Sequence, residues 1–425
     1  MPRVERGKLT CPKLADYFRE SFRPRREWLI GIEVEAMGLD AASGRPLPYE
    51  GAPATVRAAV EAYLAMRGGE AILEGDRPIG GEGPWGGLSL EPGGQFEWSS
   101  RPAAGLEALA RDLAAHQAAM REVAARIGAR WLDVAVQPDA PLEAMPWMLK
   151  ARYRIMREIM GAKGRLAHRM MTQTASIQCA FDYASEEDWT RKFRAAALLA
   201  PVAVALFANS SRADGRESGW ASYRQAIWRE TDPARCDMPD AVFAPGFGID
   251  RWVDWVCDVP TLFLRRGSGL IPSGGRPFRA LLARGGCDGV TMEDWELHLS
   301  SIFTEVRSYS YLEVRSADLQ RDELVLSVPA LWAGLLYDDD ALSDALAIGR
   351  PFDSPAAWRR AMEAAARSGL AGTVDGHRLS DLASRTVARA RASLAQGGAC
   401  PDAAAGIEAL DRLIAHRAPS LPVRA

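Results

Sequence analysis

The chain carries a short alternating segment near its start, Leu29-Ile30-Gly31-Ile32-Glu33-Val34-Glu35. Successive side chains of a β-strand point to opposite faces, so Glu33 and Glu35 share one face while the aliphatic side chains share the other. A strand of this kind fits a sheet that buries one face and leaves the other open. The segment therefore predicts a sheet with an apolar core face and an acidic open face.

Three further segments combine polar and apolar side chains in the same way. They are Leu88-Ser89-Leu90-Glu91-Pro92-Gly93-Gly94-Gln95-Phe96-Glu97-Trp98, residues 174–182 and Tyr311-Leu312-Glu313-Val314-Arg315. Carboxylates on one face of a sheet repel each other unless cations lie between them. Oxygen ligands suit Mg²⁺ or Mn²⁺, which commonly bridge nucleotide phosphates. We therefore predict a divalent-metal site, and its candidate ligands are Glu33, Glu35, Glu91, Glu97 and Glu313.

Each acidic segment has a simpler explanation when it is taken alone. Glu33 and Glu35 would then be the hydrated face of a sheet. The Pro-Gly-Gly corner marks a turn whatever its function. Glu313 and Arg315 would be a surface ion pair worth less than ~1 kcal/mol. The metal-site hypothesis depends on the four segments occurring together.

Composition places the chain among soluble globular proteins. It has 425 residues, of which 48% are hydrophobic and 25% charged. The net charge of −3 predicts no strong attraction to nucleic acid or anionic lipid. No apolar run reaches membrane length and the N-terminus is not signal-like, so we expect a cytoplasmic protein. Scattered cysteines without CxxC spacing argue against structural zinc or a dense disulfide framework. These cysteines are Cys11, Cys179, Cys236, Cys257, Cys287 and Cys400.

We expect one catalytic domain over residues 1–425 with an α+β fold. A mainly antiparallel sheet would have helices on one face and an open ligand cleft on the other. Loops are expected at 78–87 and at 210–221, the second as a substrate lid. Helical patterns occur at 12–23, 54–67, 102–128 and 186–208, and a mostly helical C-terminal part from about 353 to 420 contains 354–368, 378–395 and 401–417.

Several common catalytic and nucleotide-binding motifs are absent from the sequence. There is no Walker A loop, no GxGxxG fingerprint and no GxSxG elbow. A nucleotide would therefore be bound through metal and arginine. The five histidines form no HExxH or HxxxH motif, so each is better explained as a core or surface residue than as a metal ligand. The tryptophans of the middle region are explained more simply as core than as a ligand cage.

These motifs, in this order, resemble the glutamate–cysteine ligases of the plant and proteobacterial type, which share the glutamine synthetase and guanidino kinase fold. The acidic segment at 89–97 is close to a signature of that family. The resemblance covers about residues 12–340, and more loosely the rest. The other matching segments are 31–35, 44–51, 152–156, 206–210, 227–232, 294–299, 305–307 and 311–315.

The resemblance implies ATP-dependent joining of the glutamate γ-carboxylate to the cysteine amine through a γ-glutamyl phosphate. The product would serve glutathione or ergothioneine-type thiol synthesis. The implied cofactors are ATP and Mg²⁺ (or Mn²⁺), with the metal held by the five acids and Glu35 also near the nucleotide. Arg307 and Arg315 would bind phosphate as catalytic and cofactor-binding residues. The implied substrate-binding residues are Arg224, Arg152, Gln178, Tyr223 and Trp228.

The chain departs from the family pattern at a few positions. In the third segment Gln173 replaces an arginine and Ala180 replaces an asparagine, and in the first Val34 and Ala36 replace histidine and lysine. A buried donor matched to one substrate group discriminates strongly between substrates. We therefore expect these losses to affect substrate choice more than metal or ATP binding.

Two alternatives stay open at this point. One is a ligase of the same chemistry with a changed acid or amine substrate. The other is a non-catalytic relative that binds nucleotide, which the intact set of acids disfavours because clustered carboxylates without a function cost stability. The expected partners are small molecules, without nucleic acid or membrane, and the expected assembly is a monomer or homodimer.

Overall fold

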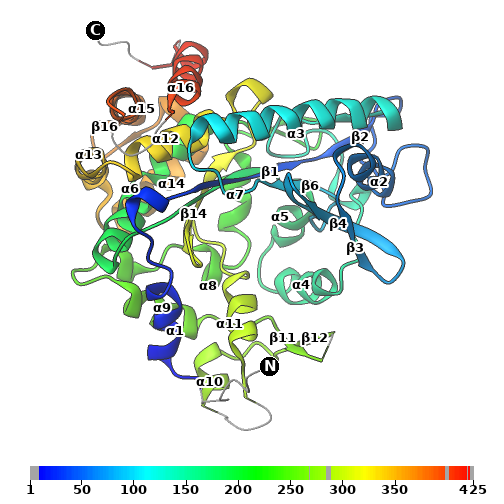
Figure 1. The fold of residues 1–425 in the computed structure, drawn as a ribbon, viewed down its shortest axis with the longest axis horizontal. Coiled ribbons are helices and arrows are strands. Elements are labelled where there is room, and N and C mark those ends of the chain that lie inside the picture. Colours follow the sequence, from blue (N-terminus) through cyan, green and yellow to red (C-terminus); the bar gives the residue numbers. More distant parts are fainter. Residues whose placement is uncertain (1–8, 268, 284–288, 398–401, 419, 422–425) are drawn as a thin grey trace.

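The computed structural model describes residues 9–267, 269–283, 289–397, 402–418 and 420–421. Two of the cysteines noted in the sequence, Cys287 and Cys400, lie outside these residues. The central feature is an eight-stranded sheet with the strand order β13-β14-β8-β1-β6-β5-β4-β3 (Figure 1). Every neighbouring pair in it is antiparallel. The predicted α+β fold with a mainly antiparallel sheet is confirmed.

The strands of this sheet come from three parts of the first 318 residues: 30–99, 176–181 and 306–318. In chain order they are β1 (Ile30–Ala36), β3 (Glu70–Glu74), β4 (Arg77–Gly83), β5 (Gly86–Leu90), β6 (Phe96–Ser99), β8 (Ser176–Phe181), β13 (Val306–Ser308) and β14 (Leu312–Asp318). Four small two-stranded sheets surround it. They pair β2 (Gly38–Asp40) with β7 (Ala129–Trp131), β9 (Arg212–Ala213) with β10 (Arg216–Glu217), β11 (Phe263–Arg266) with β12 (Gly269–Pro272), and β15 (Thr373–Val374) with β16 (His377–Arg378).

The α-helices lie before, between and after these strands. Those before residue 300 are α1 (Cys11–Arg19), α2 (Val56–Arg67), α3 (Leu106–Ile127), α4 (Ala151–Gly161), α5 (Ala167–Gln173), α6 (Glu186–Phe207), α7 (Tyr223–Arg229), α8 (Pro233–Cys236), α9 (Ile249–Asp258), α10 (Phe278–Leu282) and α11 (Met292–Leu299). Those after it are α12 (Ser327–Leu336), α13 (Asp339–Gly349), α14 (Pro355–Ser368), α15 (Leu379–Ala395) and α16 (Ala404–Arg417). Within the described ranges, no helix is both long and apolar enough to cross a membrane.

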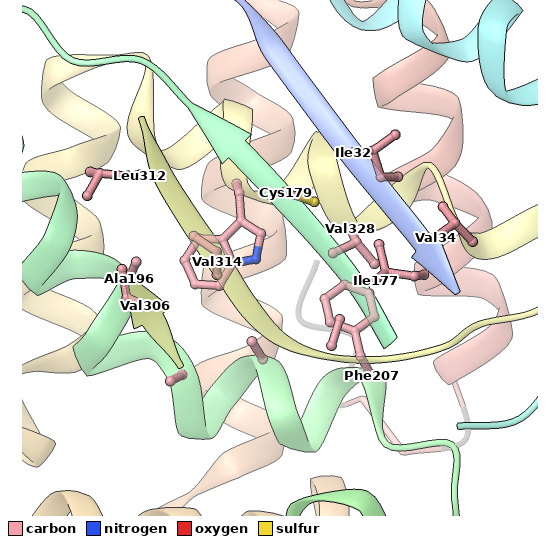
Figure 2. Close-up of a cluster of buried hydrophobic side chains, with 14 of the residues drawn as sticks. Ile32, Val34, Ile177, Cys179, Ala196, Phe207, Val306, Leu312, Val314 and Val328 are labelled. Atoms are coloured by element: carbon pink, nitrogen blue, oxygen red, sulfur yellow. The ribbon is translucent and has the colours of Figure 1, made fainter. Parts of the chain in front are cut away.

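The apolar face of the sheet forms the core. Figure 2 shows Ile32 and Val34 of β1 beside Ile177 and Cys179 of β8, with Val314 of β14 next to them. Helices α6 and α12 cover these side chains, and α3 covers the β1–β6 side, where His116 stacks on Trp98 with ring centroids 4.4 Å apart. The alternation in β1 therefore sends its aliphatic residues into the core, as the sequence predicted.

Two local predictions differ from the structure. The glycine-rich stretch 78–87, expected as a loop, forms most of β4 and the start of β5. Its glycines allow neighbouring strands of the sheet to approach closely. A Cβ on Gly80 would lie 2.3 Å from the Leu88 carbonyl oxygen of β5. Helix α3 begins at Leu106 rather than at Pro102, because Ala103 exchanges two 2.8 Å backbone hydrogen bonds with Ile30 of β1.

The Pro-Gly-Gly corner between β5 and β6 is held by contacts with the C-terminal end of α5. The Gln95 side chain accepts from the Gly93 amide and donates to the carbonyl of Thr174 at 2.8 Å. Gly93 lies directly against Thr172, so a Cβ there would be 2.3 Å from the Thr172 carbonyl oxygen. The contact between Gly93 and Thr172 is with backbone atoms, which cannot turn away as a side chain can.

We expect Gly93→Ala to lower the free energy of unfolding by about 2–3 kcal/mol, because rigid backbone must shift to admit the methyl group. Urea denaturation followed by circular dichroism measures the loss. Gly87→Ala is the matched control, since a Cβ on this strand glycine meets nothing within 4 Å. Equal stability of the two variants would contradict the assigned contact.

Candidate active site

The open face of the sheet carries a cavity of about 230 Å³, which we call the acid pocket. Glu33 and Glu35 of β1 enter it together, as the alternation of β1 requires. In the sheet register Glu33 is opposite Gln178 of β8, and Glu35 is opposite Glu97 of β6. Glu91 reaches the same cavity from the Pro-Gly-Gly corner. Four of the five predicted metal ligands thus line one pocket.

Burial and mutual repulsion dominate the electrostatics of these acids. Burial, followed by the nearby Glu313 charge, raises the pKa of Glu33 to about 7. Burial and the charge of Glu91 raise the pKa of Glu35 to about 7. The pKa of Glu97 is also well above its usual value, for the same two kinds of reason. The arginines that line the pocket offset only part of this effect, so the charged forms of these acids are disfavoured in the metal-free protein.

The donor chemistry of the acid pocket fits divalent cations, because four carboxylates line one cavity and the charged forms of Glu33, Glu35 and Glu97 are disfavoured without a cation. The carboxylates are farther apart than the ligands of a bound metal ion would be. Among the residues that the structure describes, no three His, Cys, Asp or Glu side chains converge closely enough to hold a metal ion. The carboxylates would have to turn toward a cation to bind it.

Glu313, predicted as the fifth metal ligand, binds two arginines. Its Oε2 accepts from Arg307 Nε at 2.5 Å and from Arg315 Nη1 at 2.7 Å. Burial alone would raise the pKa of Glu313, but these guanidinium groups hold it below its ordinary value. Arg315 also donates to the side-chain oxygen of Gln178. Glu313 therefore positions both predicted phosphate-binding arginines, which line the acid pocket.

Three buried donors of this pocket have no hydrogen-bond acceptor within the described part of the chain: Arg152 Nε, Arg224 Nη1 and Trp228 Nε1. Arg224 Nη1 lies 3.6 Å from Asp318, which is ion-pair distance without a hydrogen bond. Buried donors are normally paired, so each orphan donor indicates where an acceptor of a ligand belongs. Their chemistry fits carboxylate oxygens.

Asp318 supports the site without lining the acid pocket or the recess, and the sequence analysis missed it. It accepts from the hydroxyls of Ser210 and Ser222 at 2.7 and 2.9 Å, and so joins the start of α7 to β14. Strict alternation from Arg315 would turn Asp318 into the core. A β-bulge between Val314 and Ala317 shifts the register and places Asp318 opposite Ser176 on the open face. The only sequence signal for Asp318 is that it follows the fourth segment, residues 311–315, at a distance of three residues.

Tyr153 and Tyr309 also line the acid pocket without having been predicted. The Tyr153 hydroxyl donates to the Leu90 carbonyl at 2.6 Å and lies 3.2 Å from Glu91 Oε1. Tyr153 stands next to Arg152 in a segment that matched the family pattern, and that neighbourhood was the available signal. Tyr223, in contrast, was predicted to bind substrate but does not line this pocket.

A second cavity of about 200 Å³, which we call the recess, adjoins the acid pocket and shares Glu33 and Gln178 with it. Its floor is Gly31 and Ala180, which are opposite each other in the sheet, with Glu313 opposite Ala180 on the next strand. The small side chains leave this part of the open face flat. Tyr311 and Arg23 stand at its walls.

Only one of the departures from the family pattern lies at the site. Ala180 is on the open face, in the recess. Val34 and Ala36 point to the opposite, helix-covered side, since they alternate with Glu33 and Glu35. Gln173 is fully buried and binds Arg169 and the Ala140 carbonyl. The expectation that all four departures affect the cleft was therefore wrong for Val34 and Ala36, because of strand alternation, and for Gln173, because it is buried elsewhere.

Other predicted residues have ordinary places. The 210–221 loop forms the small β9–β10 hairpin and lines neither the acid pocket nor the recess. Trp252, Trp295 and Trp332 are core residues. His116 and His298 are buried, and burial lowers their pKa to about 3 and about 4.

Comparison with known proteins decides the family. The sequence pattern described as "Glutamate-cysteine ligase family 2(GCS2)" matches residues 29–420. The chain belongs to this family. The assignment to glutamate–cysteine ligases, and with it the ligase class of enzyme, is therefore confirmed.

Two curated plant proteins are similar to this chain. The chain is 37% identical over 354 residues to a chloroplastic glutamate–cysteine ligase of Medicago truncatula, covering 82% of this chain and 68% of that protein. It is 38% identical over 338 residues to the Arabidopsis thaliana protein of the same description, covering 79% and 64%. The chain thus spans about two thirds of the length of these relatives.

A solved structure agrees on the fold. The glutamate–cysteine ligase of Francisella tularensis, determined in complex with AMP, aligns with a TM-score of 0.55 at 13% identity. The alignment covers 92% of this chain and 82% of that one.

We predict that the metal-free protein loses stability as pH rises through about 7. Glu33 and Glu35 have folded-state pKa values raised to about 7, so their stabilising contribution is complete below the ordinary glutamate pKa and disappears as they ionise into mutual repulsion. Mg²⁺ should raise the melting temperature more at pH 8 than at pH 6, as differential scanning fluorimetry would show.

The double variant Glu33→Gln/Glu35→Gln is the control for this pH effect. Its melting temperature should vary less between pH 6 and pH 8 and respond less to Mg²⁺. A wild-type protein whose Mg²⁺ response is independent of pH would contradict the assignment.

Proposed function

We propose that this protein is an ATP- and Mg²⁺-dependent ligase that joins the γ-carboxylate of glutamate to the amine of cysteine. The observation that carries the proposal is one pocket with four clustered carboxylates and three unpartnered buried donors. The plant relatives are named glutamate–cysteine ligases, and the structural relative was solved with AMP. These names support the proposal, together with the family assignment.

The acid pocket would hold the amino-acid substrates by their carboxylates. Arg224 is buried, with Nη2 donating to the Arg315 carbonyl at 3.1 Å and Nη1 free to bind a ligand. Arg152 approaches from α4 and Ser300 Oγ lies 3.4 Å from its Nη2. Both guanidinium groups are held in place before substrate arrives, which lowers the entropy cost of binding.

The reaction would proceed in two substitutions. A γ-carboxylate oxygen of glutamate attacks the γ-phosphorus of ATP and ADP leaves; the cysteine amine then attacks the acyl carbon and phosphate leaves. Arg307 and Arg315, held side by side by Glu313, would bind the transferring phosphoryl oxygens. Glu33, Glu35, Glu91 and Glu97 would hold Mg²⁺, which neutralises phosphate charge when bound.

The recess is the proposed place for the nucleoside part of ATP. It shares Glu33 and Gln178 with the acid pocket, so a ligand in the recess would direct its phosphates toward the carboxylates. The flat floor of Gly31 and Ala180 leaves room for a planar ring. Ala180 also lies on the same face of β8 as Gln178, which both cavities share, so it borders both ends of the site.

A ligase of the same chemistry with another acid or amine is the second candidate. The observation that favours it is Ala180, which lies on the open face where the family usually places asparagine. A donor lost at this position removes one means of discrimination. We also propose a cytoplasmic location. The free thiols of Cys11, Cys179, Cys236 and Cys257 agree with it, because the cytoplasm keeps thiols reduced.

The deciding experiment is ADP release with ATP, Mg²⁺ and glutamate across a panel of amines, with product masses read directly. We expect γ-glutamylcysteine, and at least a ~100-fold loss of turnover in Glu97→Gln with unchanged folding. Glu82→Gln, an exposed acid of the same sheet, should keep full activity. Turnover only with another acid or amine would establish the second candidate, and full activity of Glu97→Gln would refute the metal assignment.

The orphan donor of Arg152 gives a separate prediction. Arg152→Gln should raise the KM of one amino-acid substrate about ten-fold or more, because a charge-assisted carboxylate contact is lost. Arg154→Gln, two residues along the same helix and exposed, should leave steady-state kinetics unchanged. Indistinguishable KM values for the two variants would exclude Arg152 from substrate binding.

A further inference from the structure

A cavity of about 210 Å³ lies between α7, α8 and α14, and we call it the back pocket. Trp228 lines both the back pocket and the acid pocket, so this one side chain belongs to the walls of both cavities. The proposed ligase reaction uses no other residue of the back pocket. Its volume suits a molecule of amino-acid size.

Glu305 supplies the notable chemistry of the back pocket. The side chain is 9% exposed. Its Oε1 accepts from Gln225 Nε2 at 2.8 Å, whereas its buried Oε2 has no hydrogen-bond partner within the described ranges. No basic side chain of those residues forms an ion pair with it. A buried carboxyl oxygen in this state costs free energy unless a donor from outside the chain satisfies it.

The rest of the back pocket has two different kinds of wall. Trp228, Trp358 and Met362 form an apolar wall, and the faces of the two tryptophan rings favour a neighbouring ammonium group. Two exposed arginines, Arg229 and Arg359, also line the cavity. Arg229 pairs with Glu363 through Nη1. Arg359 pairs with Asp237 and Asp240 through Nε and Nη2, so each guanidinium group has at least one further nitrogen for a ligand. The pocket therefore offers a buried acid to a positive group and exposed guanidinium groups to a negative one.

We propose that the back pocket is a second small-molecule site, which binds an amino acid with its ammonium at Glu305 and its carboxylate at Arg229 and Arg359. A plain amine would satisfy only the acid, and a plain carboxylate only the arginines. Occupancy would press on Trp228 and so change glutamate binding in the acid pocket, a consequence that rests on the proposed function. Binding itself does not depend on it.

The test is calorimetric titration of the full chain, without ATP, using L-norvaline, n-butylamine and butyrate as probes. We expect norvaline to bind, and Glu305→Gln to weaken norvaline and butylamine about ten-fold or more while butyrate is unchanged. Asp240→Asn is the control, because Asp240 binds Arg359 but does not line the back pocket. It should keep norvaline binding within about two-fold.

Two further variants make the outcome decisive. Met362→Trp should fill the back pocket and abolish norvaline binding even if Glu305→Gln fails to fold. Arg152→Gln should leave that binding intact, since it alters only the acid pocket. The proposal is overturned by no norvaline binding at about 10 mM, by unchanged binding to Glu305→Gln or Met362→Trp, or by its loss in Arg152→Gln. In turnover assays, norvaline should raise the KM for glutamate in wild type and not in Met362→Trp.

Discussion

The two-faced sheet is the constraint on which the rest of the structure depends. Its apolar face packs against α6 and α12, and this burial fixes the strand register so firmly that the opposite face must carry Glu33, Glu35 and Glu97 together. Burial of the apolar face thus offsets the repulsion between these carboxylates and holds them close together. The pKa values of these three glutamates are raised because the sheet holds them buried and close to other carboxylates.

The arginines of the site are organised in two different ways. Arg307 and Arg315 are held by one carboxylate, Glu313, and keep a fixed separation. Arg224 is attached through its backbone and side chain to Ser210, Asp318 and the Arg315 carbonyl, with one nitrogen left unpaired. The first arrangement offers rigid positive charge, and the second offers a donor that waits for an acceptor. Together they give the pocket both charge and directional specificity.

Strand alternation predicted the acids and their common face, because that property depends only on neighbouring residues. The same rule would have placed Val34 and Ala36 in the core, had it been applied to the departures as well. Sequence reasoning did not find Arg307 as the second partner of Glu313, the glycine-rich strands β4 and β5, or the position of Asp318. Each depends on which distant segment lies alongside, and a single chain does not reveal that without its partners.

The bulge in β14 has a consequence for how related chains are aligned. Deleting one residue between Val314 and Ala317 would leave the strand and its pairing with β8 nearly intact. It would also keep both faces as they are, because Ala317 would stay opposite Ile177 and Asp318 opposite Ser176. A strand of unchanged length that paired regularly would instead turn Asp318 toward the core and release the two serines that it binds. A one-residue alignment gap at this position is therefore compatible with the anchor of α7.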